Sequence, residues 1–182
     1  MSLALRLLDG HVPAVARRAA LRALFATTAA GFGCPVPPLD GLDADALLRR
    51  YTLFTRDQAE AALRDGRDLP ALHDRLERGA RALGGRLRAG LRLRTTEDAM
   101  AAARVVYGLL DIDLLGTRDG EITVRRCPFG DVYSAEVCRL VGALDSGLLA
   151  GLSGADCLEF SQRITEGAPC CLARLRPGRR AG

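Results

Sequence analysis

Lysine, asparagine and tryptophan are absent from this sequence, so all 26 of its basic residues are arginine. Without a lysine amine the chain cannot form a Schiff base with a carbonyl substrate or attach pyridoxal phosphate. It also cannot bind nucleotide phosphates through the lysine of a phosphate loop. Several large classes of enzyme are therefore excluded by composition alone.

Aromatic residues and long apolar runs are scarce as well. Only 4% of residues are aromatic, and the net charge of +4 is distributed as alternating Arg and Asp or Glu, which is typical of solvated helix faces. No nucleic-acid recognition motif is present, so nucleic acid is not an expected partner. Charged residues interrupt the amino-terminal apolar stretch, and we therefore expect no membrane contact, no secretory signal and a cytoplasmic location.

The sequence has six cysteines but no Cys-x2-Cys pair. In a reducing compartment a disulfide framework is not expected, which leaves burial, metal binding or catalysis as interpretations. A zinc finger is excluded by the spacing, and a metal site would need ligands from separate elements.

Residues 1–110 are predicted to form a helical half. Its first helix is stopped by the Gly- and Pro-rich segment "GFGCPVPPLDG", and "TTED" opens its last helix with a threonine and early acids. Apolar residues recur at helical spacing in four stretches: residues 2–30 with a break or kink at His11 and Pro13, then Asp43–Arg64, Leu69–Leu87 and Thr96–Leu110.

Residues 111–176 are predicted to form an α+β half with a cysteine site. The segment "DIDLLGTRDGEITVRRC" indicates two strands joined at "TRDG", because Asp-Gly supplies the backbone freedom that a hairpin needs. A helix follows in "DVYSAEVCRLVGALDSGLLAGL", and "CLEFSQRITEGAPCCLARL" indicates a second hairpin around "EGAP". The predicted class is therefore α+β: an amino-terminal helical assembly, then a small antiparallel sheet (strand-strand-helix-strand-strand) covered by helices. We expect one compact domain, with residues 177–182 as a flexible tail.

The cysteines fall at positions that indicate a pocket. Strand alternation puts Cys127 on the face opposite Ile122 and Val124, so its thiol is predicted to face a pocket rather than the main core. Cys138 lies in the predicted helix, seven residues from both Asp131 and Asp145, so these three share one stripe. Cys170 and Cys171 are adjacent on a strand and must point to opposite faces.

These residues also have simpler interpretations. A free cysteine often packs as a small hydrophobe, so each thiol could be a core residue. The two histidines, His11 and His73, both lie in the helical half, where a surface or interhelical position is the ordinary one. The arginines near the thiols could lower a thiol pKa or bind a substrate carboxylate, although solvent exposure is the usual state of arginine: Arg125, Arg126, Arg139 and Arg163.

The run "VRRCPFGDVYSAEVCRLVGALDSGLLAGL", followed by "LEFSQRITEGAPCCLARL", resembles the carboxy-terminal half of the L-2-amino-thiazoline-4-carboxylic acid hydrolase family. That family shows a Cys-Pro-aromatic stretch, a helical cysteine followed by an acid, and a closing hairpin with glycine and then cysteine. The segment "LLRRYTLFTRDQAEAAL" is similar to its helical half, so the resemblance spans most of residues 45–176.

This resemblance implies a hydrolase that opens a small sulfur- or nitrogen-containing heterocycle, or a cyclic amidine or amide, bearing a carboxylate. Cys127 or Cys138 would be the nucleophile and Asp145 would handle proton transfer. The substrate carboxylate would be held by arginine, and no cofactor is required. The predicted substrate-binding residues are Arg125, Arg126 and Arg163.

The same carboxy-terminal segment is more distantly similar to the 4-vinyl reductase domain, a small-molecule-binding module that in some members holds zinc. On that comparison Cys138 and Cys171 match two ligand positions, while Phe160 and Arg163 stand where glutamate and cysteine are expected, and Cys127 could replace a lost ligand. The alternative function is thus a non-catalytic sensor or accessory protein with zinc on Cys127, Cys138 and Cys171. A purely structural partner protein is a third interpretation, and the sequence leaves a homo-oligomer open.

Overall fold

A computed structural model describes residues 12–176 of the chain. In this range five α-helices enclose one side of a four-stranded antiparallel sheet, so the predicted α+β class with an amino-terminal helical part is confirmed. The elements are, in chain order, α2 (Ala14–Phe32), α3 (Ala44–Arg64), α4 (Leu69–Leu91), α5 (Thr96–Gly108), β1 (Asp113–Gly116), β2 (Glu121–Arg126), the 3-10 turn η1 (Pro128–Asp131), α6 (Ala135–Ser153), β3 (Cys157–Gln162), the 3-10 turn η2 (Ile164–Glu166) and β4 (Cys171–Arg176).

The helix starts follow from local capping. Side chains of the residues before α3, α4, α5 and α6 each accept a hydrogen bond from a backbone N–H of the first turn, which satisfies a donor that the helix itself leaves unpaired. The capping residues are Asp43, Asp68, Thr95 and Ser134. Helix α2 begins directly after Pro13. His11 and the rest of residues 1–11 lie outside the described range, so the predicted break stays a prediction, as does the tail predicted at 177–182.

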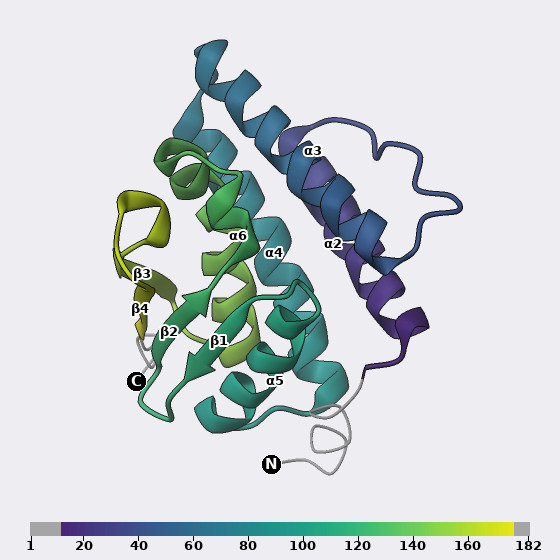
Figure 1. The fold of residues 1–182 in the computed structure, drawn as a ribbon. Helices are drawn as coiled ribbons and strands as arrows, with labels where there is room; N and C mark the ends of the chain where they lie inside the picture. The colour runs from purple at the N-terminus through teal and green to yellow at the C-terminus, as the bar shows by residue number, and fades with distance from the viewer. Residues whose placement is uncertain (1–11, 177–182) are drawn as a thin grey trace.

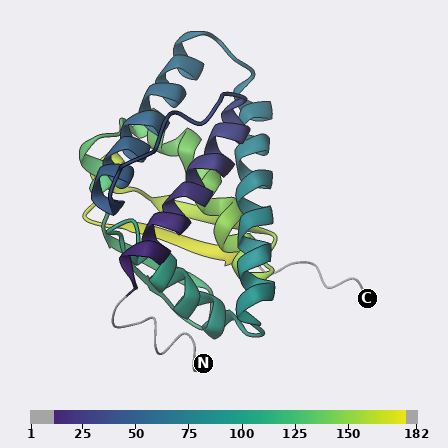
Figure 2. The ribbon, with the colours of Figure 1, turned by 90° about the vertical axis from the view of Figure 1, so that its right-hand side faces the viewer.

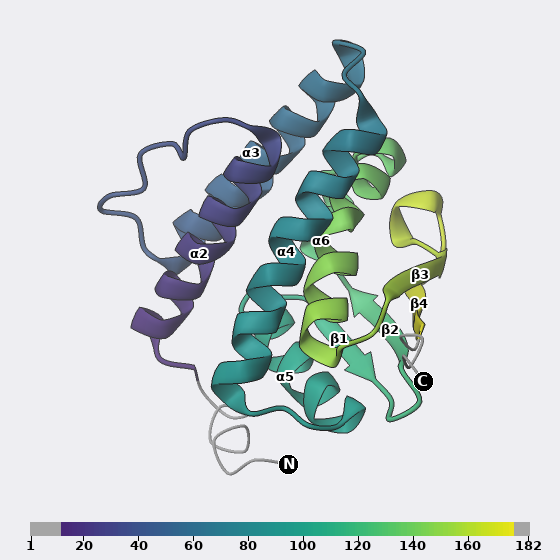
Figure 3. The ribbon, with the colours of Figure 1, turned by 180° about the vertical axis from the view of Figure 1, so that it is seen from behind.

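The layers are seen in Figures 1 and 3: the pair α2 and α3 lies outermost, α4 and α6 run side by side in the middle, and the sheet lies beyond them. Figure 2 shows α2 between α3 and α4, in front of α6 and the sheet. A continuous apolar core joins residues of both sequence halves.

The strand order is β1-β2-β4-β3, with every neighbouring pair antiparallel. The first hairpin turns at the predicted "TRDG", where Gly120 has a φ of 81° that a side chain would strain. Helices α5 and α6 cover one face of the sheet, and its other face carries mainly exposed polar residues. Each strand therefore directs alternate side chains toward α5 and α6.

Helices α4 and α6 pack with their backbones in contact. Gly84 of α4 lies against Leu148 and Gly151, and a Cβ atom added at Gly147 of α6 would collide with the carbonyl oxygen of Glu77. Small residues permit this approach, which no larger side chain would allow. The contact fixes the height and rotation of α6 over the sheet.

Candidate functional site

A β-bulge in β2 determines where Cys127 points. Asp113 pairs with Arg126 and Leu114 with Val124, so Arg125 is an extra residue in β2. The extra residue shifts the alternation of side chains by one position. Cys127 therefore lies on the same face as Ile122 and Val124, and all three line one pocket. The prediction that Cys127 faces away from Ile122 and Val124 was wrong, because it assumed uninterrupted alternation.

A second β-bulge, in β3, determines where Arg163 points. Phe160 pairs with Ala173 and Gln162 with Leu172, which leaves Ser161 as the extra residue of β3. In an unbroken strand Phe160 and Gln162 would share a face. After the bulge, Phe160 and Arg163 share it instead, and both line the pocket.

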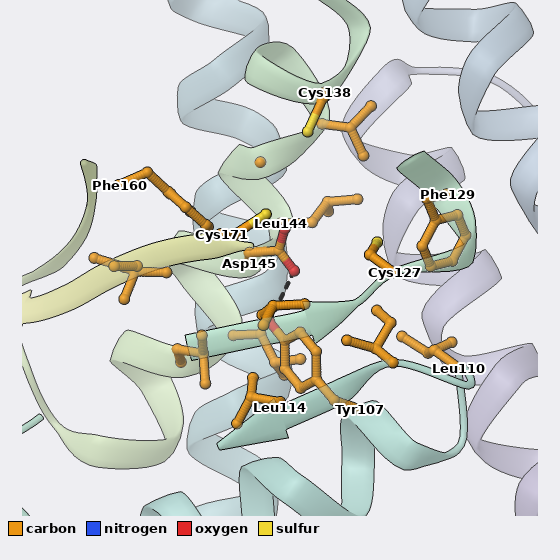
Figure 4. Close-up of a pocket in the computed structure, with 18 of the residues that line it drawn as sticks. Tyr107, Leu110, Leu114, Cys127, Phe129, Cys138, Leu144, Asp145, Phe160 and Cys171 are labelled. Atoms are coloured by element: carbon orange, nitrogen blue, oxygen red, sulfur yellow. Dashed lines mark hydrogen bonds between the residues drawn. The ribbon is translucent and has the colours of Figure 1, made fainter. Parts of the chain in front are cut away.

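The pocket lies between α6 and the inner face of the sheet and has a volume of about 100 Å³ (Figure 4). Aliphatic side chains from the sheet, α5 and α6 form most of its wall, including Leu114, Ile122, Val124, Val141 and Leu148. The charged and nucleophilic groups of the wall come from different elements: Cys127 follows β2, Cys138 and Asp145 are on α6, Arg163 follows β3, and Cys171 opens β4.

Asp145 is the acid of this pocket. Its Oδ1 accepts a hydrogen bond of 2.8 Å from the Tyr107 hydroxyl at the end of α5 (Figure 4). Burial raises the pKa of the Asp145 carboxyl, and the Tyr107 hydrogen bond and the positive charge of Arg163 oppose that rise. The carboxyl can therefore hold a proton at a higher pH than an exposed aspartate can.

The chain's tyrosines, Tyr51, Tyr107 and Tyr133, all line the pocket, and each hydroxyl has a partner. Tyr51 lies 3.0 Å from the Thr28 hydroxyl, and Tyr133 is hydrogen-bonded to Thr55. Burial raises the pKa of all three phenols, so they are neutral at physiological pH.

The Arg163 guanidinium is the cation of the pocket. Its central carbon lies 3.7 Å from the centre of the Phe160 ring, and Nη1 lies 3.9 Å from the Cys138 sulfur. On α6 it faces Gly142, where an added Cβ would lie 3.0 Å from Nη1 and 3.1 Å from Nη2. Cys138, Gly142 and Asp145 follow one another at helical spacing, so the guanidinium lies next to the α6 stripe that carries both the thiol and the acid.

The pocket thiols differ in their surroundings. Burial raises the pKa of Cys127 to about 12, and the Asp145 charge adds to that effect. Burial also raises the pKa of Cys171, whose sulfur accepts a hydrogen bond of 3.3 Å from the Ile164 N–H, while Arg163 opposes the rise. Cys138 is the thiol beside the guanidinium. No histidine of residues 12–176 lines the pocket, because His73 is on α4 near Glu77.

Several residues predicted from sequence are not in the pocket. Arg125 and Arg126 are exposed and absent from its lining, because the bulge at Arg125 turns both outward. Asp131 belongs to η1 rather than to α6, so the predicted stripe of Asp131, Cys138 and Asp145 loses its first member. The other described cysteines, Cys34, Cys157 and Cys170, do not line the pocket either. Arg139 is also absent from the lining and forms an ion pair with Glu166.

The zinc hypothesis gains no support from this geometry. Among residues 12–176, no group of three Cys, His, Asp or Glu side chains is arranged to hold a metal ion. The Cys138 and Cys171 sulfurs instead face the Arg163 guanidinium and a backbone N–H, which are hydrogen-bond donors. Cys127, Cys138 and Cys171 line one cavity without forming a ligand set.

Sequence reasoning missed Tyr107, Gly142 and the two bulges. Tyr107 is the next-to-last residue of α5 and reaches Asp145 across 38 positions of sequence, so no local signal marks the pair. Gly142 is one of 20 glycines, and only its distance to Arg163 distinguishes it.

Comparison with protein-family models, with curated proteins and with solved structures finds no match to this chain. Within the described residues, none of the helices combines the length and the apolar character that crossing a bilayer requires.

Proposed function

We propose that this protein binds a small, largely apolar organic acid in the pocket between α6 and the sheet. The observation that carries the proposal is a pair of opposite charges, Asp145 and Arg163, that line the same cavity. In the described part of the chain no ion pair joins their side chains, although Arg163 is near enough to lower the pKa of Asp145. Both groups thus retain the capacity to bind polar ends of a ligand.

The size and chemistry of the wall restrict the ligand. An engineered apolar cavity of about 150 Å³ holds one benzene molecule, and the cavity here, of about 100 Å³, is of the same order. The apolar body of the ligand should therefore be no larger than a single five- or six-membered ring. The aliphatic wall favours an apolar ring body, and few precisely placed polar groups then fix its orientation.

The polar ends of the ligand follow from Arg163 and Asp145. The guanidinium offers parallel N–H donors, which match a carboxylate. Asp145 has one oxygen engaged by Tyr107, so its other oxygen can accept from an N–H or O–H group of the ligand, or donate to it when protonated. A ring carrying a carboxylate and a hydrogen-bonding heteroatom satisfies both.

Isothermal titration calorimetry with benzoate, thiophene-2-carboxylate and 2-amino-thiazoline-4-carboxylate tests this proposal. We expect at least one acid to bind, with affinity reduced at least about tenfold in Arg163→Gln, since hydrogen bonds to charged groups contribute about 1.5–3 kcal/mol. Arg126→Gln is the matched control, because Arg126 is exposed and outside the pocket. Absence of binding for all three acids, or equal losses in both variants, would contradict the proposal.

A second candidate function is the ring-opening hydrolysis implied by the family resemblance. The observation that favours it is the Cys138 sulfur, which lies 3.9 Å from the Arg163 guanidinium in the cavity that Asp145 also lines. In this scheme the sulfur of Cys138 adds to the ring carbon between the heteroatoms, the bond from that carbon to the ring sulfur breaks, and protonated Asp145 gives its proton to the leaving ring sulfur. Water then adds to the same carbon and the bond to Cys138 breaks, which releases the Cys138 sulfur. One proton of the water goes to a ligand nitrogen and the other returns to Asp145. Cys127 is the weaker nucleophile, because its pKa of about 12 leaves little thiolate.

The hydrolase hypothesis is tested by incubation with 2-amino-thiazoline-4-carboxylate. Opening of the ring at its carbon–sulfur bond frees a thiol, which a colorimetric reagent measures against the fixed background of protein thiols. We expect turnover by the wild type, none by Cys138→Ser, and retained turnover in Cys157→Ser, whose thiol lies outside the pocket. Binding without turnover would leave the ligand-binding function alone.

A further inference from the structure

One residue in the buried stretch of α6 keeps accessible surface. Between Leu140 and Ala150 every residue of the helix is buried except Asp145. Asp145 lines the pocket, so the cavity supplies this accessible surface (Figure 4). One carboxyl oxygen is bonded to Tyr107, which leaves the other as the oxygen that a molecule in the cavity can meet.

Tyr107 is held firmly where it meets Asp145. The residue is buried, with 3% of its surface exposed. Its backbone carbonyl accepts hydrogen bonds from the N–H groups of Leu110 and Ile112, at 2.9 Å and 3.1 Å, in the connection from α5 to β1. The single phenol proton is used in the 2.8 Å bond to Oδ1 of Asp145. A donor fixed by packing and by backbone hydrogen bonds orients the carboxyl that it contacts.

The pocket wall contains several groups that carry or can carry a charge. They are Tyr51 of α3, Tyr107 of α5, Cys127 after β2, Tyr133 after η1, Cys138 and Asp145 of α6, Arg163 after β3 and Cys171 of β4. Burial raises the pKa of Asp145, and the hydrogen bond from Tyr107 and the charge of Arg163 oppose that rise. Replacing Tyr107 by phenylalanine therefore removes one of the two opposing effects without removing a formal charge from the pocket.

We propose that Tyr107 is a positioning residue that acts through Asp145 to set the pH above which the pocket selects a ligand with an N–H or O–H donor over an acceptor of the same shape. An ionised carboxyl accepts hydrogen bonds, whereas a protonated one can also donate. The free oxygen of Asp145 therefore meets a donor at high pH and an acceptor at low pH. Because the phenol of Tyr107 stabilises the ionised form, it moves this change of preference to lower pH. The inference rests on the proposed function in taking an organic molecule to occupy the pocket.

The first measurement needs no ligand. In protein labelled with isotope-enriched aspartate, the carboxyl carbon of Asp145 reports its ionisation by nuclear magnetic resonance, and its signal is the one lost in Asp145→Asn. We expect the titration midpoint in Tyr107→Phe to lie about one to two pH units above that of the wild type, the effect of losing one hydrogen bond to a charged group. Tyr51→Phe is the matched control and should leave the midpoint nearly unchanged, because the phenol that it removes from the same pocket is paired with Thr28.

The second measurement compares two ring acids of the same shape. Pyrrole-2-carboxylate has a ring N–H donor, and furan-2-carboxylate has a ring oxygen acceptor in its place. Neither ring titrates in the neutral range, so a pH dependence of their affinity ratio comes from the protein. Calorimetry across a pH series should show the ratio rising in favour of the pyrrole acid by at least about tenfold as Asp145 ionises. The rise should occur at the higher midpoint in Tyr107→Phe and be absent from Asp145→Asn.

Two outcomes overturn the inference. The first is an Asp145 midpoint that is unshifted in folded Tyr107→Phe, or shifted equally in Tyr51→Phe. The second is an affinity ratio with the same pH dependence in the wild type and in Tyr107→Phe, because a merely structural Tyr107 would change both affinities together.

The failure of this inference differs from the failure of the proposed function. If ring acids bind and Arg163→Gln weakens them, but Asp145 titrates alike in the wild type and in Tyr107→Phe, the acid site stands and the role of Tyr107 is wrong. If the midpoint moves in Tyr107→Phe but no ring acid binds, Tyr107 still positions Asp145. In that case the proposed function fails, and the ligand selection that rests on it fails with it.

Discussion

The two long faces of α6 are packed in opposite ways. Toward α4, glycines bring the two backbones into contact and leave no space, as at Gly84 and Gly147. Toward the sheet, α6 stands over a cavity of about 100 Å³, with Cys138 and Asp145 directed into it. The contacts at Gly84 and Gly147 are with backbone atoms, whereas the sheet face collects a thiol, an acid and a guanidinium.

The two faces of α6 therefore have different roles: one holds the helix in place and the other borders the pocket. A backbone contact tolerates almost no displacement, because interiors are packed as densely as crystals. The α4 face therefore holds α6 in place, and the sheet face can leave a pocket open without the helix collapsing into it. A rigid support of this kind is what a precise binding site requires.

The largest expected effect is on the α4 face. Gly147→Ala places a methyl group against the Glu77 carbonyl oxygen and 2.9 Å from the Arg81 nitrogen. We expect the free energy of unfolding, measured with urea, to fall by about 3 kcal/mol, the upper end of the usual cost of overpacking. Gly85→Ala, with no neighbour, should be neutral or stabilising by up to about 1 kcal/mol. Equal stability of both variants would mean that the close contact does not hold α6.

A large effect is also expected on the reactivity of Cys127, across the cavity from α6. Its pKa of about 12 leaves far less thiolate at pH 8 than an ordinary cysteine with a pKa of about 8.5 has. Alkylation of Cys127 by iodoacetamide should be at least about a hundredfold slower in the folded protein than in urea. Peptide mass spectrometry after timed quenching measures both rates, and the unfolded chain is its own control. Similar rates would show that the thiol is not desolvated.

A moderate effect is expected from Asp145→Asn. The pKa of Asp145 is raised in the folded protein, so between the unfolded and folded pKa values the native state holds a proton that the unfolded state has lost. Wild-type stability should therefore fall as pH rises through this window and then stay level. The stability of Asp145→Asn should not show this decrease with pH, because the asparagine does not titrate.

At pH 7 Asp145→Asn should be more stable than the wild type, by about 1.4 kcal/mol for each unit of pKa shift, with no difference below about pH 3.9. Urea unfolding across a pH series measures this. Asp131→Asn, on an exposed residue outside the pocket, is the matched control. A wild type that gains stability on raising the pH, relative to Asp145→Asn, would reverse the assigned direction.

The smallest effect is expected from enlarging a residue on the sheet face. Val141→Leu adds one methylene group that can extend into the cavity, so the free energy of unfolding should change by less than about 1 kcal/mol. The contrast with Gly147→Ala, six residues further along the same helix, is the sharpest form of the comparison. A loss above about 2 kcal/mol in Val141→Leu would show that the sheet face is packed as tightly as the α4 face.

The arrangement of elements was predictable because its signals are local. Apolar periodicity and the capping residues mark α3 and α5, and Asp-Gly marks the first hairpin. The end of α4 was predicted at Leu87, whereas the helix continues to Leu91 and ends at Arg92, whose backbone lies in the left-handed region.

The site was predictable only in part. Cys138, Asp145 and Cys171 line the pocket, and each is a position that the sequence marks, but their roles stay predictions. The orientations of Cys127 and Arg163 depend on two single-residue bulges, and strand alternation carries no sign of them. An extra residue in a strand moves every later side chain to the opposite face of the sheet. A site that depends on such a bulge can therefore be located only in the three-dimensional structure.

The placement of the tyrosines gives the protein an optical property. Tryptophan is absent, and Tyr51, Tyr107 and Tyr133 all line the cavity. Near-ultraviolet absorbance and emission of the native chain therefore come almost wholly from rings that surround one small space. A molecule that binds in the cavity should therefore change the tyrosine fluorescence, so ligand binding can be followed in the unlabelled protein.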